Sequence, residues 1–107
     1  IAASEGIPSY DEYLATMERT FIDHWMNTWP DFQDTHKYPL DHFGEANMTL
    51  CSNALAHRFG CLAFTIEMPF KDNADMPDRL YGWSDERSRM LGGSVLTPVL
   101  LVLKDLR

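Results

Sequence analysis

The sequence predicts an α/β domain in which three helices surround one central strand, and three observations support this prediction. Residues 61–68 favour β structure and are mostly apolar on both faces, which is typical of a strand whose sheet is covered on both sides. A helical pattern precedes this segment and reaches it through Gly60 alone, a short connection normal for α/β domains. Apolar residues at helical spacing also lie near both ends of the chain.

Length and charge limit the possible functions. A chain of 107 residues is enough for one small domain. Its formal net charge of −7 argues against nucleic acid and anionic membranes as partners, and it leaves peptides open. The two cysteines, Cys51 and Cys61, are too few for a disulfide framework, so we expect reduced thiols in a cytoplasmic protein. No signal peptide pattern is visible, and the start at Ile1 predicts that the chain is part of something longer.

The first helix is predicted over residues 9–29. Ser9 is the expected N-cap, with Glu12 completing a capping box, and Pro30 ends the helix. Aromatic and aliphatic residues between these limits recur at helical spacing, and such a stripe is more typical of a core than of a cofactor site.

Residues 31–46 lack any period and are expected to form a loop. His42 and Glu45 have the HxxE spacing of a metal-binding pair, but this spacing aligns two ligands only on a helix, and Gly44 argues against one. A solvated loop is therefore the favoured interpretation. His24 and His57 have no partner at ligand spacing.

A second helix should follow, capped by Asn47 and stopped by Gly60, and it should bury an apolar stripe. We also expect Cys51 and Cys61 to be buried apolar side chains, because no histidine stands where it would activate a thiolate. Glu67 then lies at the carboxyl end of the predicted strand, where α/β sheets bind ligands. A carboxylate there is either structural or a general base.

The third helix is predicted to begin at Ser84 and to run towards Arg107, with a kink or break near Pro98. Before it, residues 70–78 form a polar loop without the pattern of a calcium site. Residues 95–103 are apolar nearly all round, so we expect a larger body to cover them.

Residues 64–72, F-T-I-E-M-P-F-K-D, resemble the segment around the catalytic glutamate of zinc carboxypeptidases of the M14 class, and most closely its cytosolic branch with many bacterial relatives. E-A-N-M-T at 45–49, H-R-F-G at 57–60 and W-S-D-E-R-S-R-M-L-G at 83–92 agree with that resemblance. It covers about the last two thirds of the chain. It implies that residues 1–107 are the C-terminal part of one mixed-sheet carboxypeptidase domain. The domain would be incomplete in this chain, and the chain would pack against the rest of it.

The resemblance assigns Glu67 as the general base of a metallopeptidase that hydrolyses C-terminal residues from peptides or proteins. In that chemistry zinc polarises the scissile carbonyl and acidifies a water, and the glutamate takes the proton of that water. The zinc ligands of this class lie upstream of the glutamate, outside this chain, and His42 and Glu45 do not match them. The resemblance thus implies no metal ligand here and an inactive isolated chain.

Substrate contacts are less defined. Lys71 could meet a substrate carboxylate, although a solvated lysine after the strand is the alternative. The best-known carboxypeptidases place a substrate-contacting tyrosine about twenty residues before the glutamate, where this chain has Glu45, and the nearest tyrosine is Tyr38. Five arginine and lysine side chains are candidates for a preference for acidic substrates: Arg58, Lys71, Arg79, Arg87 and Arg89.

Two other classes of function remain open. In one, the fold persists as a non-catalytic interaction or oligomerisation module and Glu67 is only structural. In the other, the chain is a stand-alone helical binding domain whose apolar residues 95–103 form an obligate dimer, so that its folding depends on concentration.

Overall fold

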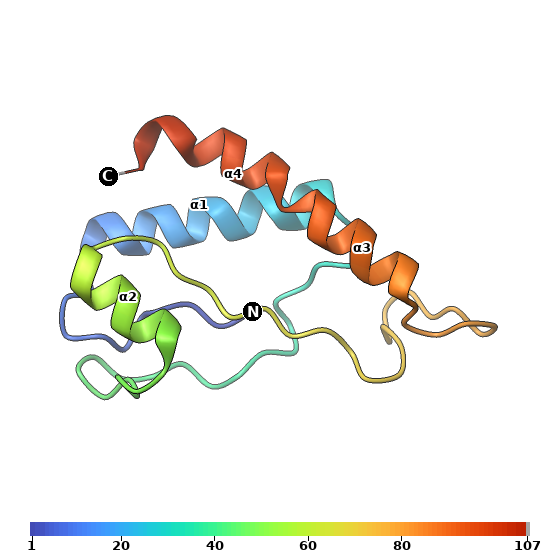
Figure 1. Cartoon of the computed structure of the whole chain (residues 1–107), viewed down its shortest axis with the longest axis horizontal. Coiled ribbons are helices and arrows are strands. Elements are labelled where there is room, and N and C mark those ends of the chain that lie inside the picture. The colour runs from blue at the N-terminus through green and yellow to red at the C-terminus, as the bar shows by residue number, and fades with distance from the viewer. Residues whose placement is uncertain (107) are drawn as a thin grey trace.

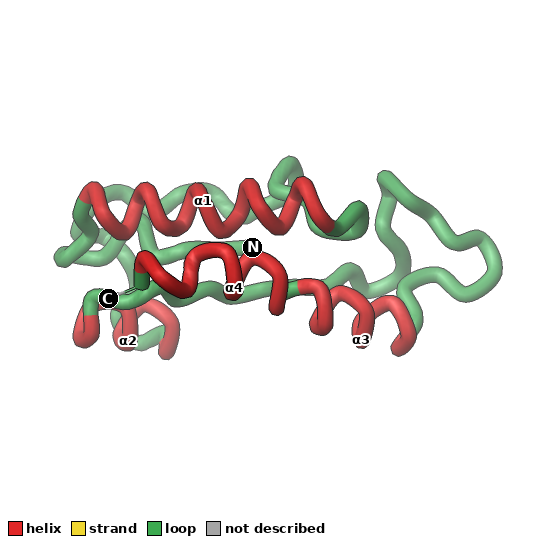
Figure 2. The backbone as a smooth tube through the Cα atoms, turned by 90° about the horizontal axis from the view of Figure 1, so that it is seen from above, coloured by secondary structure: helices red, strands yellow, loops and turns green. Residues whose placement is uncertain are grey.

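The computed structural model of the chain describes residues 1–106. Its helices are α1 (Glu12–Thr28), α2 (Cys51–Phe59), α3 (Asp85–Ser94) and α4 (Leu96–Val102), followed by the short 3-10 helix η1 (Leu103–Asp105). The longest helix, α1, runs through the middle of the molecule, with α4 beside it, α3 extending past its end and α2 lying on the other side (Figure 1). The view from above shows the long loops that separate α1, α2 and α3, whereas α3 and α4 follow one another almost directly (Figure 2).

Two hydrophobic clusters enclose α1 and account for its aromatic stripe. Met17, Phe21 and Trp25 of α1 are buried together with residues of the loop after α1, α3 and α4: Phe32, Leu91 and Val102. Nearer the start of α1, Leu14 belongs to a second cluster with Ile7, Ala46 and Ala56. The prediction that the stripe forms a core is confirmed.

The start of α1 differs from the predicted capping box. Asp11, not Ser9, is the N-cap, and its carboxylate accepts a hydrogen bond from the backbone N–H of Leu14 at 2.8 Å. The hydroxyl of Ser9 instead lies 2.8 Å from Nδ1 of His57 on α2. Aspartate and serine are equally good N-caps. Because the hydroxyl of Ser9 contacts His57, Asp11 caps the helix instead.

A buried carboxylate on α1 fixes the segment that precedes the helix. Glu18 is only 3% exposed and accepts hydrogen bonds from the N–H and hydroxyl of Ser4, the latter at 2.6 Å, and from the hydroxyl of Tyr10 at 2.7 Å. Burial and the carboxylate of Glu18 raise the pKa of Tyr10. Three donors to one carboxylate explain why a charged residue is tolerated inside.

The predicted central strand is not confirmed. Among residues 1–106 there is no strand, and residues 61–68 make one isolated antiparallel bridge, between Ala2 and Thr65, through two hydrogen bonds of 2.9 Å. The segment is extended, but a ladder needs neighbouring strands, and Ala2 is its one backbone partner within the described residues. The α/β class therefore stays unconfirmed, since the regular elements within residues 1–106 are helices.

Helix α2 starts later and buries less than predicted. The side-chain oxygen of Asn47 accepts hydrogen bonds from the N–H and hydroxyl of Thr49 in a turn before the helix, which begins at Cys51. Gly60 ends it in the left-handed conformation at φ 60°, as predicted. The predicted apolar stripe is wrong in this chain. The helix buries Asn53 and Ala56, whereas three large apolar side chains in the helix or at its cap are exposed: Leu50, Leu55 and Phe59.

The C-terminal helix begins at its predicted cap and breaks earlier than predicted. Ser84 Oγ accepts from the N–H of Arg87, which confirms it as the N-cap. The helix divides at Val95, and Pro98 lies in the first turn of α4, where its missing N–H costs no hydrogen bond. Arg107 lies outside the described residues. Cys51 is exposed and Cys61 half-buried, both as free thiols, so their predicted burial is wrong.

Candidate active site

The segment that carries Glu67 is attached to α1 by its alternate side chains. Phe64 stacks on Phe21 of α1, with ring centroids 4.8 Å apart, and Leu62 contacts both hydrophobic clusters. Thr65 pairs with Ala2 through its backbone. Because side chains alternate along an extended chain, the packing of the half-buried Leu62 and Phe64 on one face directs Glu67 to the other. Its carboxylate is exposed.

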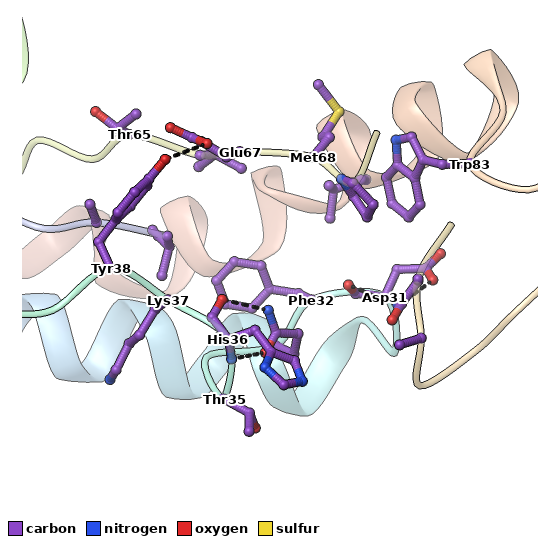
Figure 3. Close-up of a pocket in the computed structure, with 18 of the residues that line it drawn as sticks. Asp31, Phe32, Thr35, His36, Lys37, Tyr38, Thr65, Glu67, Met68 and Trp83 are labelled. Atoms are coloured by element: carbon purple, nitrogen blue, oxygen red, sulfur yellow. Dashed lines mark hydrogen bonds between the residues drawn. The ribbon is translucent and has the colours of Figure 1, made fainter. Parts of the chain in front are cut away.

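Tyr38 meets this carboxylate from the long loop after α1. Its hydroxyl donates a hydrogen bond of 3.0 Å to Oε2 of Glu67, and the two side chains point toward one another (Figure 3). The hydrogen bond and the negative charge of Glu67 raise the pKa of Tyr38, because both favour the neutral phenol over the phenolate. The structure thus joins a carboxylate and a phenol that lie 29 residues apart.

A cavity of about 580 Å³ opens beside this pair. One wall is the loop from Asp31 to Tyr38, the opposite wall runs from Thr65 to Ala74, and Trp83 and Leu91 close the end away from Tyr38. Phe32, which stacks on Trp25 at 4.2 Å, fixes the first wall to α1. The volume is that of a small-ligand pocket, and its lining mixes polar and apolar side chains at both ends.

Arg87 of α3 joins the two walls behind the cavity. Its guanidinium forms ion pairs with the carboxylates of Asp31 on the first wall and Asp72 on the second, and it lies 4.8 Å from the ring centroid of Trp83. Burial acts to raise the pKa of Asp31, but hydrogen bonds from Arg87 and Asn73 outweigh it and lower this pKa. The hydrogen bonds to Asp31 raise the pKa of Arg87.

Other predicted site residues lie apart from the cavity. Lys71 is exposed and does not line it, although its carbonyl accepts from the N–H of Trp83 at 2.7 Å, so its role toward a substrate carboxylate stays a prediction. His42 and Glu45 are exposed in a turn. Across residues 1–106, no three histidine, cysteine or carboxylate side chains gather to hold a metal ion, so these residues do not fit a zinc site. No helix in the described part of the chain could cross a bilayer.

Comparison with known proteins supplies the context of this geometry. The metallo-carboxypeptidase of Pseudomonas aeruginosa, solved in complex with (2-guanidinoethylmercapto)succinic acid, matches 99% of this chain at 42% identity with a TM-score of 0.95. The metallo-carboxypeptidase of Burkholderia cenocepacia matches 97% at 40% identity with a TM-score of 0.90. The resemblance to carboxypeptidases is confirmed.

The match spans only part of each relative. The chain covers 28% and 27% of these two carboxypeptidase structures. An uncharacterised protein of Zymomonas mobilis is 43% identical over 96 residues, which are 90% of this chain and 25% of that protein. No protein-family model matches the chain. The chain is thus similar, in fold and in sequence, to one segment of these bacterial metallo-carboxypeptidases.

The sequence singles out Glu67, whose role as a base stays a prediction, and it assigns no role to the residues around Glu67. The carboxypeptidase spacing pointed to position 45, whereas the structure brings Tyr38 to the carboxylate. Arg87 had been considered only as a substrate contact, and no motif indicated that it pairs with Asp31, 56 residues away. A signal did exist, because Asp72 directly follows the segment that resembles the carboxypeptidases and Arg87 lies near the start of the next helix.

Proposed function

We propose that this chain is the C-terminal part of the catalytic domain of a zinc-dependent carboxypeptidase, and that Glu67 is its general base. The observation that supports this most strongly is the position of Glu67 in the carboxypeptidase-like segment, where it faces a cavity and is hydrogen-bonded to Tyr38. The metal of the related enzymes would be held by side chains outside this chain, since residues 1–106 offer no metal cluster.

The chemistry of Glu67 follows from its surroundings. An exposed carboxylate that faces a cavity can take a proton from a water molecule as that water attacks a peptide carbonyl, and it can then pass the proton to the leaving amine. Tyr38 limits the rotation of the carboxylate by donating to one of its oxygens, which leaves the other oxygen available for this exchange.

The substrate would be the C-terminus of a peptide or protein, bound in the cavity with its scissile bond near Glu67. The remainder of the catalytic domain would pair its strands with residues 61–68 and so complete a mixed sheet. Exposed apolar side chains on α2 and α4, including Leu55, Phe59 and Leu100, agree with such a covering body. The free thiols are those expected in the cytoplasm.

The test is the variant Glu67→Gln in the complete protein, compared with Glu12→Gln, an exposed glutamate in the first turn of α1. We expect kcat for blocked peptides to fall about 10²- to 10⁴-fold in Glu67→Gln, because the amide cannot accept the proton of water. Bound zinc, measured by atomic emission, should be the same in both variants and the wild type. Full activity of Glu67→Gln would contradict the proposal and favour a structural glutamate.

A further inference from the structure

Two contacts join the walls of the cavity beside Glu67, one at each end. At one end the hydroxyl of Tyr38 donates to Glu67. At the other end, Asp31 faces the segment that follows Glu67: Nδ2 of the buried Asn73 donates to Oδ1 of Asp31 at 3.1 Å, and Arg87 bridges Asp31 and Asp72. The spacing of the walls therefore depends on both contacts.

The bridge uses most of the hydrogen-bonding capacity of the guanidinium. Nε and Nη2 of Arg87 both donate to the carboxylate of Asp31, the former at 3.3 Å, while Nη1 donates to Oδ1 of Asp72 at 2.9 Å. Nη2 also donates to the carbonyl of Met76 at 2.9 Å. A planar fork with five donors can serve two carboxylates and a carbonyl at once, which the compact ammonium of lysine cannot do in the same geometry.

The surroundings shield this bridge from water. The side chain of Arg87 is 15% exposed and that of Asp31 is 10% exposed, so water competes little for these hydrogen bonds. Without the guanidinium, two carboxylates would remain near one another in a partly buried place, and they would repel each other. Losing Arg87 should therefore push the walls apart as well as release them.

The chain connects this bridge to the reacting groups over short distances. Asp72 lies five residues after Glu67, with Pro69 between them to restrict the backbone, and Asp31 begins the wall that ends at Tyr38. The carbonyl of Lys71 is held by the N–H of Trp83, which directly precedes the N-cap of α3. A displacement at Asp72 is thus passed to Glu67 through a few residues of restricted chain.

We propose that Arg87 is a positioning residue that sets the spacing of the two cavity walls and thereby the contact between Tyr38 and Glu67. The proposal rests on the proposed function in that Glu67 is taken as the base. Arg87 touches no reacting atom. It acts through Asp31 and Asp72.

The experiment compares Arg87→Met and Arg87→Lys with Arg89→Met in the complete protein. Arg89 is a matched control, because it lies two residues away on α3, is 65% exposed, and pairs only with Asp85 and Glu86 of its own helix among the interactions described. Hydrolysis of blocked peptides ending in each common amino acid gives kcat and KM. Each variant is also made with Tyr38→Phe, and 3-fluorotyrosine at position 38 reports the pKa of that phenol by fluorine NMR.

We expect Arg87→Met to lower kcat about ten- to a hundredfold, Arg87→Lys to restore part of it, and Arg89→Met to match the wild type. In the Tyr38→Phe background, Arg87→Met should lower kcat by a smaller factor than in the wild type, because both changes break the same contact. In Arg87→Met the pKa of Tyr38 should fall towards its ordinary value. If Arg87 is purely structural, its loss lowers stability, and the kcat losses from Arg87→Met and Tyr38→Phe are additive in free energy. That result would overturn the proposal, and so would equal kcat values in Arg87→Met and Arg89→Met.

Failure of the proposed function gives a different pattern. If the wild type hydrolyses no peptide, Glu67 is not shown to be a base, and the fluorine titration alone decides the role of Arg87. A lower pKa of Tyr38 in Arg87→Met but not in Arg89→Met would support the bridge, and an unchanged pKa in both would overturn it. If Arg87→Met does not fold by circular dichroism, Arg87→Lys enters the same comparisons, with smaller effects in the same directions.

Discussion

At the residue scale, Glu67 and Tyr38 form a pair whose members depend on each other. Tyr38 is held in a long loop without regular structure, and the described hydrogen bond of its hydroxyl goes to the glutamate. Glu67 lies on a segment that is fixed to α1 through Phe64. The carboxylate is therefore the member of the pair whose backbone is anchored to α1, and the phenol reaches it from a loop.

The pairing predicts a pH dependence of Tyr38. Its pKa is raised by the hydrogen bond to Glu67 and by that residue's charge, so the phenol keeps its proton beyond the ordinary tyrosine pKa of about 10. The contact is therefore complete at neutral pH and is lost as the pH rises through the raised pKa. In Glu67→Gln the charge is gone, and the fluorine titration of 3-fluorotyrosine at position 38 should move to lower pH. Glu45→Gln, in the same loop region, is the control, and equal titrations in both variants would contradict the pairing.

At the scale of elements, the junction between the Glu67 segment and α3 depends on Gly82. Its φ is +61°, and a Cβ built on it would lie 2.4 Å from the carbonyl oxygen of Lys71. This carbonyl accepts the hydrogen bond from the N–H of Trp83 that closes the loop. A side chain at position 82 would have to displace the backbone on the Glu67 side of the cavity.

We therefore expect Gly82→Ala to lower the free energy of unfolding by about 1–3 kcal/mol, from the unfavourable φ and the clash with backbone. Gly92→Ala is the matched control, because Gly92 lies within α3 with no atom within 4 Å of the added Cβ. It should raise stability by about 0.5–1 kcal/mol, since alanine favours the helix. Urea unfolding of the complete protein measures both, and a neutral Gly82→Ala would show that the loop adjusts freely.

The elements also show what the sequence could predict. Periodicity located α1 and its core face, and Ser84 and Gly60 marked helix ends, because these signals are local. The cap at Asp11, the exposed face of α2 and the break at Val95 depend on tertiary contacts that no local pattern contains. A motif singles out Glu67 as the proposed base, whereas Tyr38, Asp31 and Arg87 come together only through the fold.

At the scale of the whole molecule, the surface carries more apolar side chains than the contacts within the chain explain. Leu96, Leu100 and Leu103 form a stripe on α4 and η1 and are 68%, 71% and 57% exposed, while the opposite face of α4 packs on α1 through Pro98 and Val102. Since the chain spans about a quarter of its relatives, the remainder of a carboxypeptidase domain is the proposed cover of this stripe.

This cover can be tested with Leu100→Glu, a charge in the middle of the stripe. If Leu100 is covered in the complete protein, the new carboxylate is buried without a partner. We therefore expect Leu100→Glu to lower the free energy of unfolding by more than about 3 kcal/mol. Thr97→Glu, on the same helix but beside the stripe, should change it by less than about 1 kcal/mol. The isolated chain, whose stripe is open, should tolerate Leu100→Glu and become less prone to associate. Two results together would contradict this cover: an unchanged free energy of unfolding of the complete protein, and an isolated chain that folds only as a dimer which Leu100→Glu dissociates. The stripe would then serve self-association, and the stand-alone binding domain would be the better account.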